Sequence, residues 1–169
     1  MKIANLQNCS VFIDTNILIY AFTSTRFTPA CEVLLDKAYA GEVNGHLNST
    51  VIDEFFHKVL LMQVYAKKGM QPAEAITFLK HNPDRIRDFS LPFDVTREVL
   101  HDYRLTVLDT APVLDEALAL SRKYCLLFSD ALHTACYFLM RSILPATLTI
   151  NSIISSQMIG IFPESIASR

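Results

Sequence analysis

Val11-Phe12-Ile13-Asp14-Thr15-Asn16 is the stretch that decides the fold of this chain. Its first three residues are apolar and either β-branched or aromatic, which predicts a buried strand. A carboxylate, a hydroxyl and an amide follow at once, and open α/β sheets bind ligands beyond the carboxyl ends of their strands. We therefore expect Asp14 at the mouth of a site, either as a cation ligand or as the N-cap of a helix that begins near Asn16.

The bulk composition predicts a single soluble domain. The chain has 169 residues, of which 51% are hydrophobic and 19% charged, which is enough apolar material for a sizeable core. The net charge is −2, so contact with nucleic acid would need a local basic patch. The four cysteines form no C-x-x-C pair, and no apolar run reaches the roughly 18 residues of a membrane span. We expect a cytoplasmic protein with reduced cysteines and no membrane contact.

The hydrophobic periodicity predicts strands that alternate with helices. The expected strands cover about residues 10–13, 45–48, 106–108, 147–150 and 159–162. The expected helices cover about residues 16–22, 29–41 with Thr28 as cap, 51–68 with Ser49 or Thr50 as cap, 72–80, 96–103, 112–123, and 130–140 with Ser129 as cap. This alternation predicts an α/β fold with a parallel sheet.

Three acids occupy comparable places in this pattern. Asp14 follows the first strand, Glu54 lies early in the long helix, and Asp130 opens a late helix. Hard divalent cations prefer oxygen ligands, and Mg²⁺ takes a few carboxylates together with water. Carboxylates near helix N-termini also favour the helix dipole, so each acid has a purely structural alternative.

The order of these motifs resembles the PIN domain family, which includes ribonuclease toxins of the VapBC type. The motifs are Asp-Thr-Asn at residues 14–16, a glutamate about forty residues later, and Ser-Asp-Ala-Leu-His-Thr-Ala at residues 129–135. The resemblance runs from about Val11 to Phe162. It implies a three-layer α/β/α fold with a small, mainly parallel sheet of four to five strands. It also implies a single domain over residues 1–169, with a core at about 11–162 and an enlarged helical segment at about 63–105.

The resemblance further implies an endoribonuclease that depends on Mg²⁺ or Mn²⁺. Asp14, Glu54 and Asp130 match the family's metal-binding acids. The supporting polar residues would be Thr15, Asn16, Ser129, Asn151 and Ser152. Implied partners are an RNA substrate, a protein antitoxin and a second copy of the chain.

Ser152 departs from the family pattern. It stands where the resemblance leads us to expect the fourth acid, after Thr149-Ile150-Asn151. A hydroxyl can bind Mg²⁺ but brings no charge. The alternative function is therefore a catalytically weakened PIN-like module that binds nucleic acid or protein.

Two further predictions concern recognition. Arg26, in a polar loop, is a candidate contact for phosphate, and an ordinary solvated arginine is its alternative. A set of apolar residues could form an exposed groove for a partner, although a place in the core is favoured for each one taken alone. The set is Phe55, Phe56, Met62, Tyr65, Met70, Phe78 and Leu79.

A different class of protein also matches part of the pattern. Glu54-x-x-His57 and Asp130-x-x-His133 resemble the carboxylate-x-x-His pairs of di-iron helical bundles. The strand signals argue against an all-helical bundle. For both histidines we favour packing beside their own helix.

Overall fold

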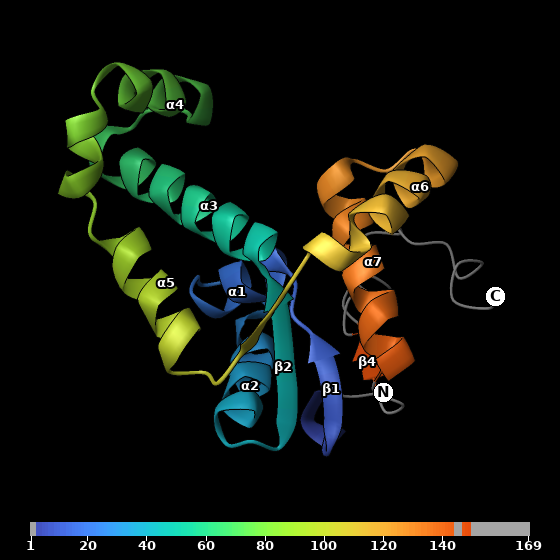
Figure 1. The fold of residues 1–169 in the computed structure, drawn as a ribbon. Coiled ribbons are helices and arrows are strands. Elements are labelled where there is room, and N and C mark those ends of the chain that lie inside the picture. Colours follow the sequence, from blue (N-terminus) through green and yellow to red (C-terminus); the bar gives the residue numbers. More distant parts are fainter. Residues whose placement is uncertain (1–2, 144–146, 150–169) are drawn as a thin grey trace.

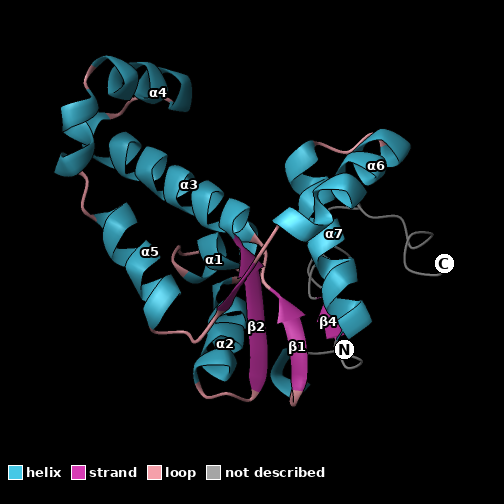
Figure 2. Cartoon of the chain, viewed as in Figure 1, coloured by secondary structure: helices cyan, strands magenta, loops and turns pink. Residues whose placement is uncertain are grey.

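The computed structural model describes residues 3–143 and 147–149, and the side chains of residues 3–143. Asn151, Ser152 and the strand predicted at 159–162 lie outside this part of the chain. Four parallel strands form one sheet in the order β3-β2-β1-β4 (Figure 2). The strands are β1 (Cys9–Phe12), β2 (Val43–Asn48), β3 (Thr106–Leu108) and β4 (Thr147–Thr149). Each of the first four strands predicted from the sequence is confirmed.

Helices account for most of the described chain. The α-helices are α1 (Thr15–Ala21), α2 (Thr28–Tyr39), α3 (Ser49–Lys68), α4 (Pro72–His81), α5 (Leu91–His101), α6 (Leu114–Tyr124) and α7 (Phe128–Ile143). Short 3-10 turns are η1 (Ile3–Asn5), η2 (Pro83–Asp88) and η3 (Ala111–Val113). Within the described residues, no helix is both long enough and apolar enough to cross a bilayer.

The sheet is the middle layer of three (Figure 1). Gly45 of β2 faces α2, because a Cβ atom built on it would lie 3.5 Å from the side chain of Ala38. Asn48 of the same strand faces the other side, where its amide contacts His133 and Cys136 of α7. This alternation is the two-residue period of a strand buried on both faces. The predicted three-layer α/β/α fold is confirmed.

The core has two parts. The main cluster surrounds β1, all four residues of which are buried, and includes Phe12 and Phe55. A second cluster lies around the far half of α3, where Val64, Leu79 and Phe89 pack together. Figure 1 shows α3 extending away from the sheet, with α4 at its far end and α5 returning beside it. The enlarged segment of the chain therefore has its own small core.

Several helix starts differ from the prediction. Asn48, not Ser49 or Thr50, caps α3, and its side chain accepts a hydrogen bond from the Val51 backbone. Ser129 is the second residue of α7 rather than its cap. Helix α2 includes Thr28 as its first residue, with Phe27 as cap. Helix α5 begins five residues earlier than expected, because a proline fits the first turn of a helix.

Candidate active site at the carboxyl ends of the strands

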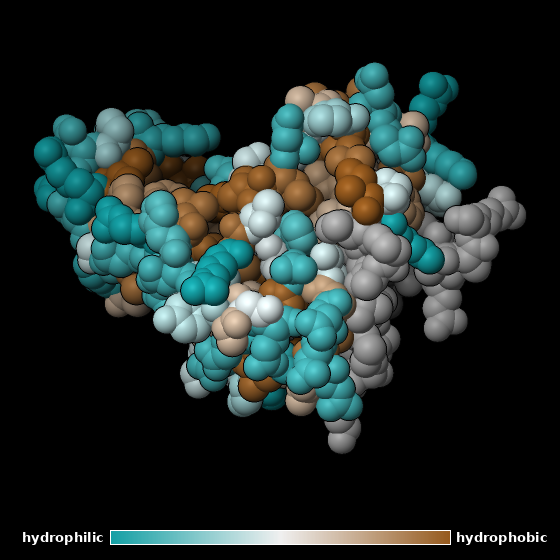
Figure 3. Space-filling model, turned by 60° about the horizontal axis from the view of Figure 1, so that its bottom comes forward, coloured by the Kyte–Doolittle hydropathy of each residue, from teal (hydrophilic) through white to brown (hydrophobic). Residues whose placement is uncertain are grey.

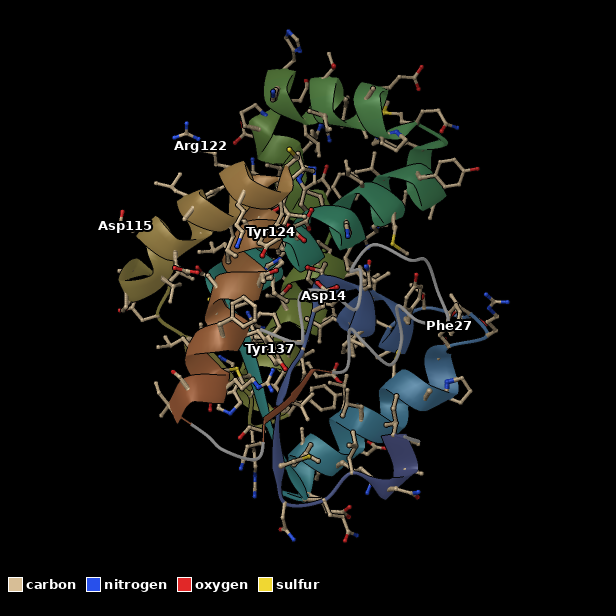
Figure 4. All side chains as sticks on the ribbon, turned by 90° about the vertical axis from the view of Figure 1, so that its right-hand side faces the viewer. Asp14, Phe27, Asp115, Arg122, Tyr124 and Tyr137 are labelled. Atoms are coloured by element: carbon tan, nitrogen blue, oxygen red, sulfur yellow. The ribbon has the colours of Figure 1, made fainter. Side chains whose placement is uncertain are left out.

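Asp14 lies directly beyond β1 and is the N-cap of α1. Its Oδ1 atom accepts a hydrogen bond from the Thr15 backbone N–H at 2.7 Å. The structural alternative, a helix cap, is thus confirmed. The role of cap does not exclude that of ligand, since a carboxylate has about four lone-pair sites and this bond uses one. Figure 4 shows Asp14 in the middle of the molecule, where the ribbons of α1 and α3 meet.

Glu54 is brought to Asp14 by Thr15. The Thr15 hydroxyl donates to Oε2 of Glu54 at 2.8 Å, and Thr15 itself is fully buried. The Glu54 side chain is 30% exposed, so one side of the pair is open to solvent. Residues 39 positions apart in the sequence therefore join the first turn of α1 to the second turn of α3.

The electrostatics of this site disfavour the charge on Asp14. Burial raises the pKa of Asp14 above the usual carboxyl range, and the nearby Glu54 carboxylate raises it further. His133, the Thr15 N–H and Lys58 act in the opposite direction. Two carboxylates in a partly buried site repel each other, and a cation between them would remove this repulsion.

His133 and Asn48 are residues of this site that the sequence analysis did not assign to it. His133 does pack in the core, with its ring 5.8 Å from that of Phe12. Its Nε2 atom also lies 3.9 Å from Oε1 of Glu54, and its Nδ1 atom lies 3.2 Å from Nδ2 of Asn48. The Asp130-x-x-His133 spacing was a signal for His133, whereas nothing in the sequence marked Asn48. The packing role expected for His57 is wrong, because its side chain is exposed.

Within the described residues, the other predicted site residues are more exposed than Thr15 or show no contact with this pair. Asp130 and Asn16 are exposed, and Ser129 is half-buried in the first turn of α7. Within residues 3–143 and 147–149, no three His, Cys, Asp or Glu side chains come close enough together to hold a metal ion. The structure thus gathers two of the three predicted acids.

Arg26 lies on the loop between α1 and α2 rather than at the carboxylates. Its guanidinium group stacks on the ring of Phe27, 4.5 Å from the ring centroid. Phe27 lies at the edge of the molecule in Figure 4, while Asp14 lies at the centre. Lys58, one turn after Glu54 on α3, is the cation whose charge acts on Asp14.

Comparison with known proteins identifies the family. The model of the PIN domain family matches residues 11–144, which include the end of β1, the acids of the site and α7. The chain belongs to the PIN domain family. No curated protein and no solved structure matched it significantly. PIN domains are generally nucleases, and the fold of this PIN domain, with its parallel sheet, excludes the di-iron helical bundle.

PIN nucleases usually use Mg²⁺ or Mn²⁺, and the donor set of this PIN domain fits such an ion. Mg²⁺ is commonly bound by one or two carboxylates, with water and substrate phosphates completing the coordination. Asp14 and Glu54 supply two carboxylates, and the charge of Glu54 raises the pKa of Asp14. They would hold the ion, because oxygen donors of this type suit Mg²⁺ and Mn²⁺.

Proposed function

We propose that this PIN domain is a metal-dependent endoribonuclease that resembles the toxin of a type II toxin–antitoxin pair and hydrolyses RNA phosphodiesters. The observation that carries the proposal is the pair of carboxylates, Asp14 and Glu54, joined by the buried hydroxyl of Thr15 at the carboxyl ends of the strands. Such a pair is poorly explained as a device for stability, since burial opposes the charge of Asp14.

The chain's own residues hold the pair in place. The Thr15 N–H holds Oδ1 of Asp14, and the Thr15 hydroxyl holds Oε2 of Glu54. Asp130 is the third acid of the proposal, from the first turn of α7. A bound Mg²⁺ or Mn²⁺ would supply positive charge against the charge that develops on the phosphodiester. In this scheme Asn16, Ser129, Asn151 and Ser152 are supporting polar residues.

Contact with the RNA backbone is assigned to cations near the pair. Lys58 is exposed on α3, and its charge acts on Asp14. We therefore rank it above Arg26, whose guanidinium group already stacks on Phe27. Phosphate contacts of this kind position a substrate without reading its sequence.

The finer assignments follow the same proposal. The domain would extend over residues 1–169, with residues 63–105 as its helical insertion, in a cytoplasmic protein. A protein antitoxin or a second copy of the chain would need exposed apolar surface, and apolar patches are visible in Figure 3. Leu114 and Leu118 of α6, together with Leu127 and Phe128 at the start of α7, are exposed apolar residues. Of the groove expected from the sequence, only Met62 and Tyr65 are exposed, and the other members pack in the two cores.

A non-catalytic PIN module is the second candidate. It is favoured by the exposed position of Asp130 and by the absence, within the described residues, of a cluster of three metal-ligating side chains. Ser152 in place of an acid points the same way. In this case the site would bind RNA or protein without hydrolysis.

Cleavage of a mixed-sequence single-stranded RNA tests the proposal. We expect the wild-type protein to cut with Mn²⁺ or Mg²⁺ but not with EDTA, and Asp14→Asn to reduce the rate at least about a hundredfold. Asn caps a helix as well as Asp, so this variant keeps α1 intact. Asp115→Asn, on the outer side of α6 in Figure 4, is the matched control and should cut normally.

The other outcomes are equally informative. Unchanged metal-dependent cleavage in Asp14→Asn would rule out the assigned site. No cleavage by any of the three folded proteins, with the ion bound, would favour the non-catalytic module.

A further inference from the structure

Asn48 fixes the orientation of its own amide. It is the last residue of β2, is fully buried, and caps α3. The Val51 backbone N–H points at its side chain and is 3.0 Å from Oδ1. Since an N–H needs an acceptor, the oxygen must stand on this side, and the NH₂ group must stand on the other.

The NH₂ group of Asn48 in turn fixes the state of His133. It lies 3.2 Å from Nδ1 of His133 and 3.4 Å from the sulfur of Cys136. An amide nitrogen only donates, so Nδ1 must accept and can carry no hydrogen. A neutral imidazole has one ring hydrogen, which is then on Nε2.

The Nε2–H group faces the carboxylate site. Nε2 is buried and makes no hydrogen bond with a described residue, and Oε1 of Glu54 is 3.9 Å away. This distance is too long for a hydrogen bond, but such contacts in metal-free sites often shorten when the ligand binds. The other carboxylate oxygen, Oε2, already accepts from Thr15. Each oxygen of Glu54 therefore faces one donor.

We propose that Asn48 and His133 form a relay that orients Glu54: the Asn48 amide holds His133 in the Nε2–H form, and Nε2–H donates to Oε1 of Glu54. The proposal rests on the proposed function, in which Glu54 is a metal ligand. His133 is then a positioning residue and not a metal ligand, because Nε2 has no free lone pair in this form. The relay links the end of β2, α7 and α3.

The hydrogen position can be tested without metal or RNA. Long-range ¹H–¹⁵N correlation spectra of protein labelled with ¹⁵N-histidine distinguish the two neutral forms. We expect the Nε2–H pattern for His133 in metal-free wild-type protein at about pH 8, where a free imidazole is neutral. The Nδ1–H pattern would overturn the proposal.

Asn48→Asp provides the matched variant. Aspartate still caps α3 but cannot donate to Nδ1, so we expect a proton to appear on Nδ1 of His133. If His133 kept only its Nε2 proton, the amide would not control the imidazole and the relay would be wrong. Should this variant fail to fold, the wild-type spectrum still decides the form of His133.

The effect on Glu54 is tested by Mn²⁺ affinity, measured from the paramagnetic resonance signal of free Mn²⁺ without RNA. Mutation of a residue that orients a metal ligand typically lowers metal affinity by about 10- to 100-fold. We expect a loss of about this size in His133→Asn, whose amide reaches only the Nδ1 position. His133→Gln places an amide nitrogen near the Nε2 position, and we expect it to retain affinity within about threefold of wild type. Equal affinities in the two variants, with both folded, would overturn the proposal.

The two arms also separate this proposal from the proposed function. If no protein bound Mn²⁺ while His133 showed the Nε2–H pattern and responded to Asn48→Asp, the metal-dependent function would fail and the relay would stand. If Mn²⁺ bound tightly but the pattern were Nδ1–H, the relay would fail and the nuclease would stand.

Discussion

At the scale of single residues, the negative charge of Asp14 disfavours the folded state. Its pKa is raised, chiefly by burial, so the folded state prefers the neutral acid. The stabilising contribution of the neutral acid is complete below the unfolded pKa of about 4. It is lost as the pH rises from there through the raised folded pKa, because the charge must then be held in a buried place.

Asp14→Asn should therefore stabilise the protein at neutral pH when no metal is present. The gain in free energy of unfolding should shrink as the pH falls and vanish below about 4, where aspartate becomes neutral in both states. Urea denaturation in EDTA at several pH values measures this. If the difference in free energy of unfolding between the variant and the wild type did not vary with pH, the charge of Asp14 would not be what destabilises the folded protein.

Thr15 supplies the hydrogen bond that joins the two acids. Thr15→Val keeps the shape of the side chain but removes the donor, and we expect a loss of about 1 kcal/mol in stability. Mn²⁺ affinity should fall about tenfold, as for other residues that orient ligands. Thr15→Ser keeps the hydroxyl and should retain the affinity, measured again by paramagnetic resonance. Equal affinity in the Val and Ser variants would argue against orientation by the hydroxyl.

At the scale of elements, the two ends of α3 differ in how far the local sequence determines them. Its C-cap is Gly69 with φ of 69°, and Lys67 and Lys68 stand in its last turn, so the helix ends at the predicted residue 68. Its N-cap is Asn48 rather than the predicted Ser49 or Thr50. All three residues can cap a helix, so the choice depended on where β2 ended.

Gly69→Ala should destabilise the protein by about 1 kcal/mol. An added Cβ meets no atom within 4 Å, so the loss comes from the left-handed backbone alone. Asn tolerates this conformation better, and Gly69→Asn should lose less. Urea denaturation of the two variants gives the comparison, and an Ala variant as stable as wild type would contradict it.

At the scale of the whole molecule, the two hydrophobic clusters predict two levels of stability. Phe12 and Phe89 are both 1% exposed, but they belong to the main and the second cluster respectively. Regions with separate cores can open separately from the global unfolding of a protein. Helix α3 connects the two, since it supplies residues to both clusters.

Phe89→Ala should speed amide hydrogen exchange in α4 and η2, while β1 and β2 keep their protection. Phe12→Ala, the matched control, should speed exchange in both regions, because loss of the main core removes the support of α3. Removing a buried phenylalanine costs about 3–5 kcal/mol, which is ample for detection by mass spectrometry. Equal acceleration in all elements of Phe89→Ala would show that the molecule opens as one unit.

Much of the fold followed from local pattern. The alternation of apolar strands with helices predicted the parallel sheet with Asp14 at its carboxyl end, and the family resemblance grouped Glu54 with Asp14. The start of α5 was missed although Pro92, Val95 and Val99 share its buried face at a helical spacing, and the exposure of Asp130 depends on how α7 packs. The tertiary packing of the helices decides where such a helix begins and which of its side chains are exposed.

The sequence by itself determined the first strand, the acid that follows it and the family to which the chain belongs. These features depend on residues that are neighbours in the chain, so the order of apolar and polar residues is enough to recognise them. The tertiary structure alone decided that Asn48 holds His133, 85 residues away, and that His133 faces Glu54. Contacts of this kind arise from the order of strands and the packing of helices, because side chains distant in sequence meet only where the folded backbone brings their elements together.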